Sequence, residues 1–307
     1  MIYTVTLNPS LDRIIDIDEL IYDDVNQILE EKRQVSGKAI DVARVIGGLG
    51  GHSCLLGLVG GYNGFEVEGR LINEGIVCDL GKLSGETRTN IIIHQTRKKL
   101  QTLFSASEPQ VTPAELAAFY NKLCEIPRDS YVVISGSVPP GISENFYAQI
   151  ITSLAGKNVR IILDADGEAL RRGVKAKPFL IKPNIHEFGR LVEKNVRDVD
   201  EIIEKVDPYL AFVRYIVVSM GARGVVAVSQ TERYQVVPPK VNVKSSIGAG
   251  DALIGGLVYA LSEGSSFADA LTLGVACGTA STLNAAGVFC SGDDVENIRK
   301  EVLVKNI

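Results

Sequence analysis

A glycine-rich turn followed by an aspartate is the strongest chemical signal in the sequence. Residues 245–253 read SSIGAGDAL and lie between a β-like run and a helix of small residues. Because Gly248 and Gly250 have no side chain, consecutive backbone N–H groups can point inward and, with the helix N-terminus, hold anionic oxygens. Asp251 then lies in the first turn of that helix, where aspartate is also an ordinary cap. An aspartate beside an anion site suits phosphoryl transfer, in which a carboxylate takes the proton of an attacking hydroxyl.

A second polar group follows an apolar strand expected at 179–182. Asn184 and Glu187 are three residues apart at a helix start and can face the same side. They offer oxygen ligands for a water-rich Mg²⁺ that bridges phosphates. The same pair also fits a capping box, with Asn184 as the N-cap and Glu187 at the third helical position. Both interpretations stay open.

Two more strand-end turns could hold a ligand or simply redirect the chain, namely SMGARG at 219–224 and SGSVPPG at 135–141. The chain has no GxxxxGK[ST] sequence, which argues against a P-loop enzyme. The glycines of 57–64 lack the GxGxxG spacing, which argues against a dinucleotide-binding dehydrogenase. The histidines, at 52, 94 and 186, are too dispersed to suggest a metal site or a catalytic triad.

The elements that must position these residues alternate between strand and helix. The expected strands are 2–7, 53–59, 131–135, 159–163, 179–182 and 215–219, with a hairpin-like run at 224–237. The expected helices are 36–48, 64–74, 113–123, 144–155, 251–262 and 266–285. Such alternation predicts βαβ crossovers and one mainly parallel sheet, whose ligands gather at the carboxyl ends of the strands.

Two half-polar β segments interrupt this alternation. Residues 12–35 contain brief apolar alternations with many charges, and residues 90–104 read as a hairpin around the basic turn 96–99. We expect the two segments to form a small sheet that stands off the main domain and covers a cleft or pairs with another subunit.

Composition narrows the class of protein. The chain has 307 residues, 46% of them hydrophobic, and a net charge of −5, which argues against a broad nucleic-acid surface. Five scattered cysteines without a CxxC pair indicate reduced thiols. The N-terminal segment lacks the basic region of a signal peptide, and no apolar run is long enough to span a bilayer. We therefore expect a cytoplasmic protein.

Six motifs in order resemble those of the PfkB (ribokinase-like) carbohydrate kinases, in the branch of 1-phosphofructokinases, tagatose-6-phosphate kinases and minor 6-phosphofructokinases. The motifs are TLNPSLD at 6–12, Gly37-Lys38 with VAR at 42–44, TRTN at 87–90, SGSVPPG at 135–141, Lys182-Pro183-Asn184 with Glu187, and GAGD at 248–251. The resemblance implies an α/β fold over residues 1–307: a ribokinase-like three-layer α/β/α sandwich with a mainly parallel central sheet. It also implies a small β-sheet lid from roughly 12–35 and 88–106, which in several members makes a homodimer.

The resemblance further implies a kinase that uses ATP and Mg²⁺ to convert a ketohexose phosphate to the bisphosphate. The acceptor would be fructose 1-phosphate, tagatose 6-phosphate or fructose 6-phosphate. Asp251 would be the catalytic base, with the backbone amides of Gly248, Ala249 and Gly250 as the anion hole. The implied ATP-binding residues are Lys182, Asn184, Ser219, Gly221, Gly224, Ser246, Gly250 and Asn284, and Asn184 and Glu187 would act on Mg²⁺ through water.

The residues implied for the acceptor are Asp12, Gly37, Lys38, Asp41, Arg88, Asn90 and Ser137. Asp12 would hold sugar hydroxyls, whereas Lys38, Arg88 and Ser137 would hold the phosphate already on the sugar. This division fits the chemistry of the groups, because a carboxylate pairs with hydroxyls and cations pair with phosphate.

This chain departs from the family pattern in the acceptor region. The usual GGKGxN is SGKAID at 36–41, so Ser36 and Ala39 replace glycines and Asp41 replaces asparagine. A lysine that grips the sugar phosphate in some relatives is missing from DDVN at 23–26. An added carboxylate beside a phosphate pocket repels the substrate or demands a different hydroxyl pattern.

Three other functions stay open beside the hexose-phosphate kinase. One is a kinase for an unphosphorylated sugar or a nucleoside, against which Lys38 and Arg88 argue. Another is a catalytically weak sugar-phosphate sensor, suggested by the departures at 36–41, although a sensor has no need of Asp251. The last is a glycine-rich structural scaffold, which leaves the order of the six motifs to coincidence.

Overall fold

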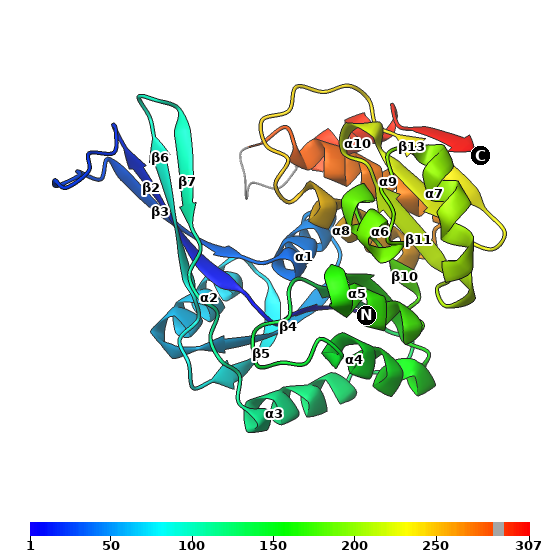
Figure 1. Cartoon of the computed structure of the whole chain (residues 1–307), viewed down its shortest axis with the longest axis horizontal. Coiled ribbons are helices and arrows are strands. Elements are labelled where there is room, and N and C mark those ends of the chain that lie inside the picture. Colours follow the sequence, from blue (N-terminus) through cyan, green and yellow to red (C-terminus); the bar gives the residue numbers. More distant parts are fainter. Residues whose placement is uncertain (285–291) are drawn as a thin grey trace.

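Within residues 1–284 and 292–307, which the computed structural model describes, ten strands form one large sheet with helices on both faces (Figure 1). The order across the sheet is β14-β13-β12-β11-β10-β9-β8-β1-β4-β5. The pairs from β11 to β5 are parallel, and the three pairs from β11 to β14 are antiparallel. The strands are β1 (Ile2–Thr6), β4 (Ser53–Gly60), β5 (Val77–Leu83), β8 (Tyr131–Ser135), β9 (Arg160–Asp164), β10 (Leu180–Ile181), β11 (Tyr215–Ser219), β12 (Val225–Val228), β13 (Arg233–Val237) and β14 (Leu303–Asn306).

Helices cover both faces of this sheet because its central strands are apolar on both sides. Val133 of β8 packs on one face, and its neighbours Val132 and Ile134 pack on the other. The helices on the Val133 face are α1 (Lys38–Gly48), α8 (Ala249–Ser262), α9 (Phe267–Ser281) and α10 (Gly292–Arg299). Those on the opposite face are α3 (Pro113–Cys124), α4 (Phe146–Leu154), α5 (Gly167–Lys175), α6 (Ile185–Leu191) and α7 (Val199–Val206). The expected α/β/α sandwich is confirmed.

A separate four-stranded sheet projects from the larger one, at the left of Figure 1. Its order is β3-β2-β6-β7, and β2 pairs with β6 in parallel although the two strands lie far apart in the chain. The strands are β2 (Ser10–Ile17), β3 (Glu30–Ser36), β6 (Thr89–Gln95) and β7 (Leu100–Phe104). Helix α2 (Gly61–Asn73) and α1 contribute side chains to an apolar cluster that joins the base of this sheet to β4 and β5 of the main sheet. The expected hairpin at 90–104 is confirmed as the antiparallel pair β6 and β7.

Several element limits differ from the expected ones, and the differences have local causes. Helix α9 ends at Ser281, and the expected end at Ala285 lies outside the described residues. After Ser281 the backbone amides of residues 282–284 donate to carbonyls three residues earlier, so the α-helical bonding pattern ends there. Strand β5 was not expected, because an edge strand that reads VCDLGKL lacks the apolar run of a central strand. The charged helix α7 and the short strand β14 were also not expected.

No helix in the described part of the chain combines the length and the apolar character that a membrane crossing requires.

Candidate functional site

The predicted glycine turn lies at the N-terminus of α8, which is 14 residues long. Gly248 is the N-cap and has a φ of 81°, a left-handed conformation that favours glycine. The amide of Ala252 donates to the carbonyl of Gly248 at 2.8 Å, which closes the first turn of the helix. The amides ahead of Ala252 therefore lie at the positive end of the helix dipole, as an anion site requires.

Asp251 is almost fully enclosed behind this turn, with 9% of its surface exposed. Burial raises the pKa of its carboxyl well above the usual range, and the nearby carboxylates of Asp164 and Asp41 raise it further. The ammonium groups of Lys38 and Lys182 act in the opposite direction. The fold thus brings the predicted base together with one predicted acceptor lysine and one predicted ATP lysine.

A buried ion cluster joins these two lysines. Asp164 ends β9 with 1% of its side chain exposed, and its two oxygens lie 3.3 Å from Lys38 Nζ and 3.1 Å from Lys182 Nζ. Ser135 at the end of β8 donates to Asp164 at 2.9 Å. Burial alone would raise the pKa of Asp164, but the two lysines outweigh it and lower that pKa. Burial likewise works to lower the pKa of Lys38, and the carboxylates of Asp164, Asp251 and Glu187 outweigh it and raise that pKa.

Sequence reasoning missed Asp164. The available signal was an aspartate that ends an apolar strand expected to be parallel, one strand away from Lys182 in the sheet. Side chains at the carboxyl ends of neighbouring parallel strands share one edge, where ligands bind.

Asn184 and Glu187 form a capping box at the start of α6. The side chain of Asn184 accepts bonds from the amides of His186 and Glu187 at 2.9 Å, and Glu187 Oε2 accepts the amide of Asn184 at 2.7 Å. The carboxylate of Glu187 is buried, yet it acts on the pKa of Lys38, so it lies close to the ion cluster. The two amides use both lone pairs of Asn184 Oδ1, whereas Glu187 keeps lone pairs that fit a Mg²⁺ ion that retains most of its waters. In the described residues no three acidic, His or Cys side chains form a metal cage.

The turn predicted to hold ATP phosphates follows β11. Ser219 ends that strand beside Asn184, with its amide bonded to the carbonyl of Pro183 at 3.0 Å. Gly221 and Gly224 have φ values of 60° and 80°, and a Cβ at Gly224 would lie 1.9 Å from the carbonyl oxygen of Val236. This turn therefore needs glycine for its shape. Ser246 is exposed ahead of α8, and Asn284 is half-buried just after α9, as the last described residue before the gap.

Several of the predicted acceptor-binding residues lie where the small sheet joins the main body. Asp12 and Asn90 are direct partners across β2 and β6, and Asn90 Nδ2 donates to Asp12 Oδ1 at 2.7 Å. Ser10 Oγ donates to the same oxygen at 2.8 Å. Gly37 is the N-cap of α1, which starts with Lys38. Asp41, in the first turn of α1, binds Arg44 rather than either lysine.

Arg88, Asn8 and Ser137 form a second polar group near this junction. Arg88 Nη2 donates to the carbonyl of Asn8 at 3.3 Å, and Asn8 Nδ2 donates to Ser137 Oγ at 3.0 Å and also to Glu108. Arg88 Nε and Asn8 Oδ1 are buried without a hydrogen-bond partner among the described residues. Buried polar atoms rarely lack partners in folded proteins, so this group has capacity to bind a ligand. Asn8 and Glu108 were not singled out as site residues from the sequence.

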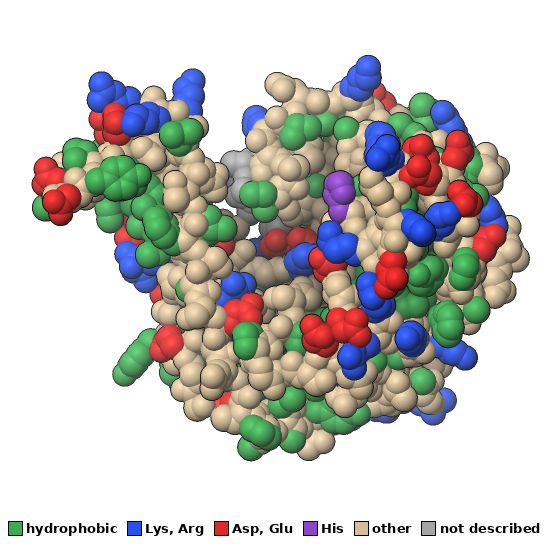
Figure 2. Space-filling model, in the orientation of Figure 1, with side chains coloured by type: hydrophobic (Ala, Val, Ile, Leu, Met, Phe, Trp, Pro, Cys, Tyr) green, Lys and Arg blue, Asp and Glu red, His purple; other side chains and the backbone are tan. Residues whose placement is uncertain are grey.

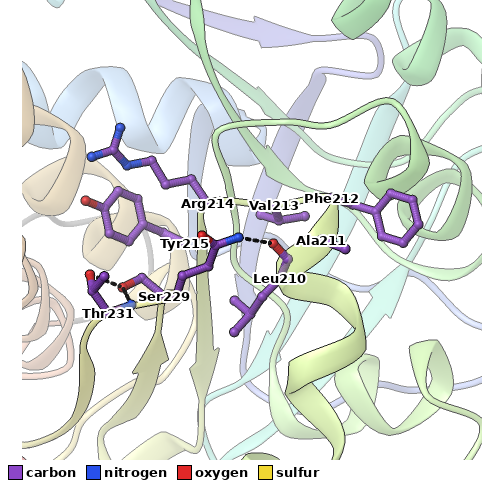
Figure 3. A pocket seen from close by; sticks show the side chains of 9 residues that line it. Leu210, Ala211, Phe212, Val213, Arg214, Tyr215, Ser229 and Thr231 are labelled. Atoms are coloured by element: carbon purple, nitrogen blue, oxygen red, sulfur yellow. Dashed lines mark hydrogen bonds between the residues drawn. The ribbon is translucent and has the colours of Figure 1, made fainter.

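Figure 2 shows a cleft between the small sheet and the main body, with acidic and basic side chains on its floor. A separate shallow cavity of about 410 Å³ lies near the start of β11, lined by residues that include Phe212, Arg214, Tyr215 and Gln230 (Figure 3). In that cavity Gln230 donates to the carbonyl of Leu210. The cavity is at the opposite end of β11 from Ser219 and contains no predicted site residue.

The chain is similar to several known carbohydrate kinases. The sequence profile described as pfkB family carbohydrate kinase matches residues 5–291. The chain is 36% identical to a 1-phosphofructokinase of Borreliella burgdorferi, over 100% of this chain and 99% of that protein. It is 30% identical to the ATP-dependent 6-phosphofructokinase isozyme 2 of Escherichia coli, over 97% of each chain. The crystal structure of phosphofructokinase-2 from Escherichia coli in complex with fructose-6-phosphate superposes with a TM-score of 0.90, at 30% identity over 98% of each chain.

Proposed function

Because the chain belongs to the pfkB family of carbohydrate kinases, we propose that it transfers the γ-phosphoryl group of ATP to a hydroxyl of a ketohexose phosphate and forms the bisphosphate. One observation carries the proposal. Asp251, a buried carboxylate, directly follows an anion-binding turn and lies close enough to Lys38 and Lys182 for both to act on its pKa. A base, an anion site and cations on two sides are the parts that phosphoryl transfer needs. The names of the relatives favour fructose 1-phosphate or fructose 6-phosphate as the acceptor.

On the donor side, the amides at the start of α8 and the ammonium of Lys182 would receive the terminal phosphates of ATP. The residues that would border the phosphate chain of ATP are Ser219, Gly221, Gly224 and Ser246. Asn284 would lie near the adenine. Asn184 and Glu187 would hold Mg²⁺ through water, and Mg²⁺ supplies charge neutralisation on the phosphate oxygens when bound. Lys182 supports this assignment, because its Nζ is only 3.5 Å from where a Cβ at Gly250 would lie.

On the acceptor side, we assign the sugar hydroxyls to Asp12, Asn90 and Asp41. The phosphate already on the sugar would bind Arg88, Ser137 and Lys38. The unpartnered Nε of Arg88 supports this assignment, because a phosphate oxygen gives that buried donor an acceptor.

The chemistry follows from the position of Asp251. Its ionised carboxylate takes the proton of the acceptor hydroxyl as that oxygen bonds to the γ-phosphorus, and the bond from the γ-phosphorus to the bridging oxygen breaks to release ADP. The amides of Gly248, Ala249 and Gly250 stabilise charge on the transferring phosphoryl group. Residues of roughly 12–35 and 88–106 would form a lid that excludes water from this step.

The test is a panel of fructose 1-phosphate, fructose 6-phosphate, tagatose 6-phosphate, free fructose and a nucleoside with Mg-ATP, scored by ADP release and by the mass of the product. We expect one ketose phosphate to exceed free fructose in kcat/KM by about 100-fold or more, because each charged contact to phosphate contributes about 1.5–3 kcal/mol. Equal rates on free fructose would favour the unphosphorylated acceptor. Sugar-phosphate binding without turnover would favour the sensor.

A homodimer through the small sheet is the arrangement we propose for this enzyme. Large apolar side chains are exposed on that sheet and its connecting loop, namely Ile21, Tyr22, Val25, Ile28, Leu29, Leu100, Leu103 and Phe104. Figure 2 shows hydrophobic side chains gathered on the projecting arm, and exposed patches of this kind mark association surfaces. Sedimentation of the wild type and of Leu103→Glu tests it, with a shift of the variant toward monomer as the expected result.

A cytoplasmic location is part of the proposal. Cys54, Cys78, Cys124 and Cys277 are free thiols, which fits a reducing compartment, whereas Cys290 lies outside the described residues.

A further inference from the structure

Asp164 holds a place in the site that the sequence motifs do not cover. Its Oδ2 lies 3.3 Å from Lys38 Nζ, and its Oδ1 lies 3.1 Å from Lys182 Nζ, so each oxygen takes a different lysine. Ser135 is the direct partner of Asp164 in the β8–β9 register, and its hydroxyl donates to Oδ2 at 2.9 Å. The carboxylate is therefore fixed by strand ends in the core of the sheet.

The two lysines come from opposite sides of the proposed reaction centre. Lys38 begins α1 beside the acceptor residues, and 42% of its side chain is exposed. Lys182 directly follows β10, with 5% of its side chain exposed, and its ammonium lies beside Gly250 in the anion-binding turn. A lysine ammonium on a flexible four-carbon stem has no fixed place of its own, so a rigid anion between two lysines sets the place of both.

A simple ion pair needs one cation, whereas Asp164 has two lysine ammonium groups within 3.3 Å. The carboxylates of Asp251 and Glu187 also act on Lys38, so charge balance alone does not require both lysines to meet at Asp164. Lys182 Nζ lies beside Gly250 in the turn at 248–250, where the proposed phosphate would bind. Each carboxylate oxygen of Asp164 faces a different lysine ammonium, so we expect Asp164 to act on the substrates through the lysines.

We propose that Asp164 is a positioning residue that holds Lys38 and Lys182 at a preset separation, one for the phosphorylated acceptor and one for the terminal phosphates of ATP. The geometric part needs only the contacts above, whereas the roles of the two lysines rest on the proposed function. Asp164 thereby links the acceptor and donor sides of the site through one carboxylate.

The first test needs no substrate. Protein labelled with ¹⁵N at the lysine Nζ atoms is compared by NMR for wild type, Asp164→Asn and a matched control, Asp166→Asn, which removes an exposed carboxylate two residues away that pairs with Arg190. Lys38→Met and Lys182→Met assign the signals. We expect slowly exchanging ammonium signals for both lysines in wild type and in the control, and their loss in Asp164→Asn. Both signals unchanged in Asp164→Asn would overturn the proposal.

The second test compares the KM for the sugar phosphate with the KM for ATP in each variant, and thermal melts confirm that each variant is folded. Lys38→Met should raise mainly the KM for the sugar phosphate, and Lys182→Met mainly the KM for ATP. Asp164→Asn should raise both by about tenfold or more, the loss expected for one charge-assisted contact on each side. In the double variant Asp164→Asn/Lys38→Met, the acceptor KM should be no higher than in Lys38→Met alone. A change in melting temperature with both KM values unchanged would reduce Asp164 to a structural residue.

Asp164→Asn/Lys182→Met, which keeps the charge balanced, replaces the single variant if Asp164→Asn does not fold. In it the Lys38 ammonium signal should be lost, and its persistence would contradict the proposal. The two proposals fail separately. A wild type that phosphorylates no ketose phosphate removes the proposed function, whereas the response of the ammonium signals to Asp164→Asn still decides the positioning role.

Discussion

Arg44 Nη1 donates to Asp41 Oδ1 at 2.9 Å across one turn of α1. The same guanidinium binds Glu74 through Nε at 2.7 Å, so its charge is shared between two carboxylates. Asp41 is consequently only part-neutralised. Burial raises the pKa of Asp41 to about 6, and the carboxylates of Glu74 and Asp12 add to that rise against the effect of Arg44. Asp41 is thus a buried carboxylate whose charge is only partly compensated.

Asp41→Asn should stabilise the protein at neutral pH. The pKa of Asp41 is about 6 in the folded protein against 3.8 for an unperturbed aspartate, so folding favours the protonated form. Well below pH 4 the group is protonated in both states and has no effect. As the pH rises from about 4 to 6, the unfolded chain ionises first, and stability falls by up to about 3 kcal/mol.

Thermal melts from pH 4 to 8 measure this effect. The variant should melt above the wild type at pH 7, and the difference should vanish near pH 4. Glu74→Gln is the matched control, because it removes a carboxylate that raises the pKa of Asp41 and should shrink the pH-dependent loss. A variant that is less stable than the wild type at pH 7 would mean that the Arg44 contact outweighs burial.

The rate of phosphoryl transfer should rise with pH through the pKa of Asp251, because the base must be ionised. Burial places that pKa well above the usual carboxyl range. Asp41→Asn removes a carboxylate that raises the pKa of Asp251, so the acidic limb of the kcat profile should move to lower pH. Lys38→Met removes a cation that lowers it, so the limb should move to higher pH. Shifts in the same direction for both variants would contradict this electrostatic account.

Asp251→Asn should lower kcat by about 10²–10⁴-fold, the usual contribution of a general base. Asparagine has the same shape but cannot take the proton, so the affinity for ATP should change little. Single-turnover rates and nucleotide titration separate the two effects. Asp269→Asn is the control, because Asp269 also lies in the first turn of a helix but contacts only Ser266 there. Wild-type turnover in Asp251→Asn would remove Asp251 from the mechanism.

The main sheet and the glycine turn could be predicted because each depends on local sequence. Apolar runs such as 131–135 and 215–219 specify buried strands. The GAGD turn needs a positive φ at Gly248, a conformation that glycine adopts readily. The parallel pairing of β2 with β6 was not foreseen, because nothing in either segment specifies a partner about 80 positions away in the chain. The two segments were expected only to share a small sheet.

The site was harder to predict where a role depends on partners. Asp164 ends an apolar strand like many structural aspartates, and only the fold brings Lys38 and Lys182 to its two oxygens. Asn184 and Glu187 show the reverse case. The sequence allowed a capping box as the alternative to a Mg²⁺ site, and the structure contains that capping box. The proposed role toward Mg²⁺ depends on a ligand that the sequence cannot place.

If Arg88 binds the acceptor phosphate as proposed, Arg88→Ala should raise the KM for the phosphorylated acceptor by about 10–100-fold, with a smaller effect on kcat, because a charged donor is lost. Free fructose, which has no phosphate, should be affected much less. Arg97→Ala is the matched control, since Arg97 lies on the turn between β6 and β7 with 69% of its side chain exposed. Steady-state kinetics with both acceptors make the measurement. An unchanged acceptor KM would discard Arg88 as a phosphate ligand.

Gly256→Ala should destabilise the protein by about 1–3 kcal/mol, because α8 and α9 meet there without room for a methyl group. A Cβ at Gly256 would lie 2.7 Å from Cys277 Sγ and 3.0 Å from the carbonyl oxygen of Leu273. Relief of that overlap requires α8 to shift, and α8 carries Asp251 at its start, so kcat should fall as well. Gly69→Ala, in α2, is the control: its Cβ meets nothing within 4 Å, and alanine there should stabilise by about 0.5–1 kcal/mol. Denaturant unfolding measures the stability of both variants, and steady-state kinetics measure kcat. A Gly256→Ala protein that is as stable and as active as the wild type would show that α8 and α9 separate without disturbing the site.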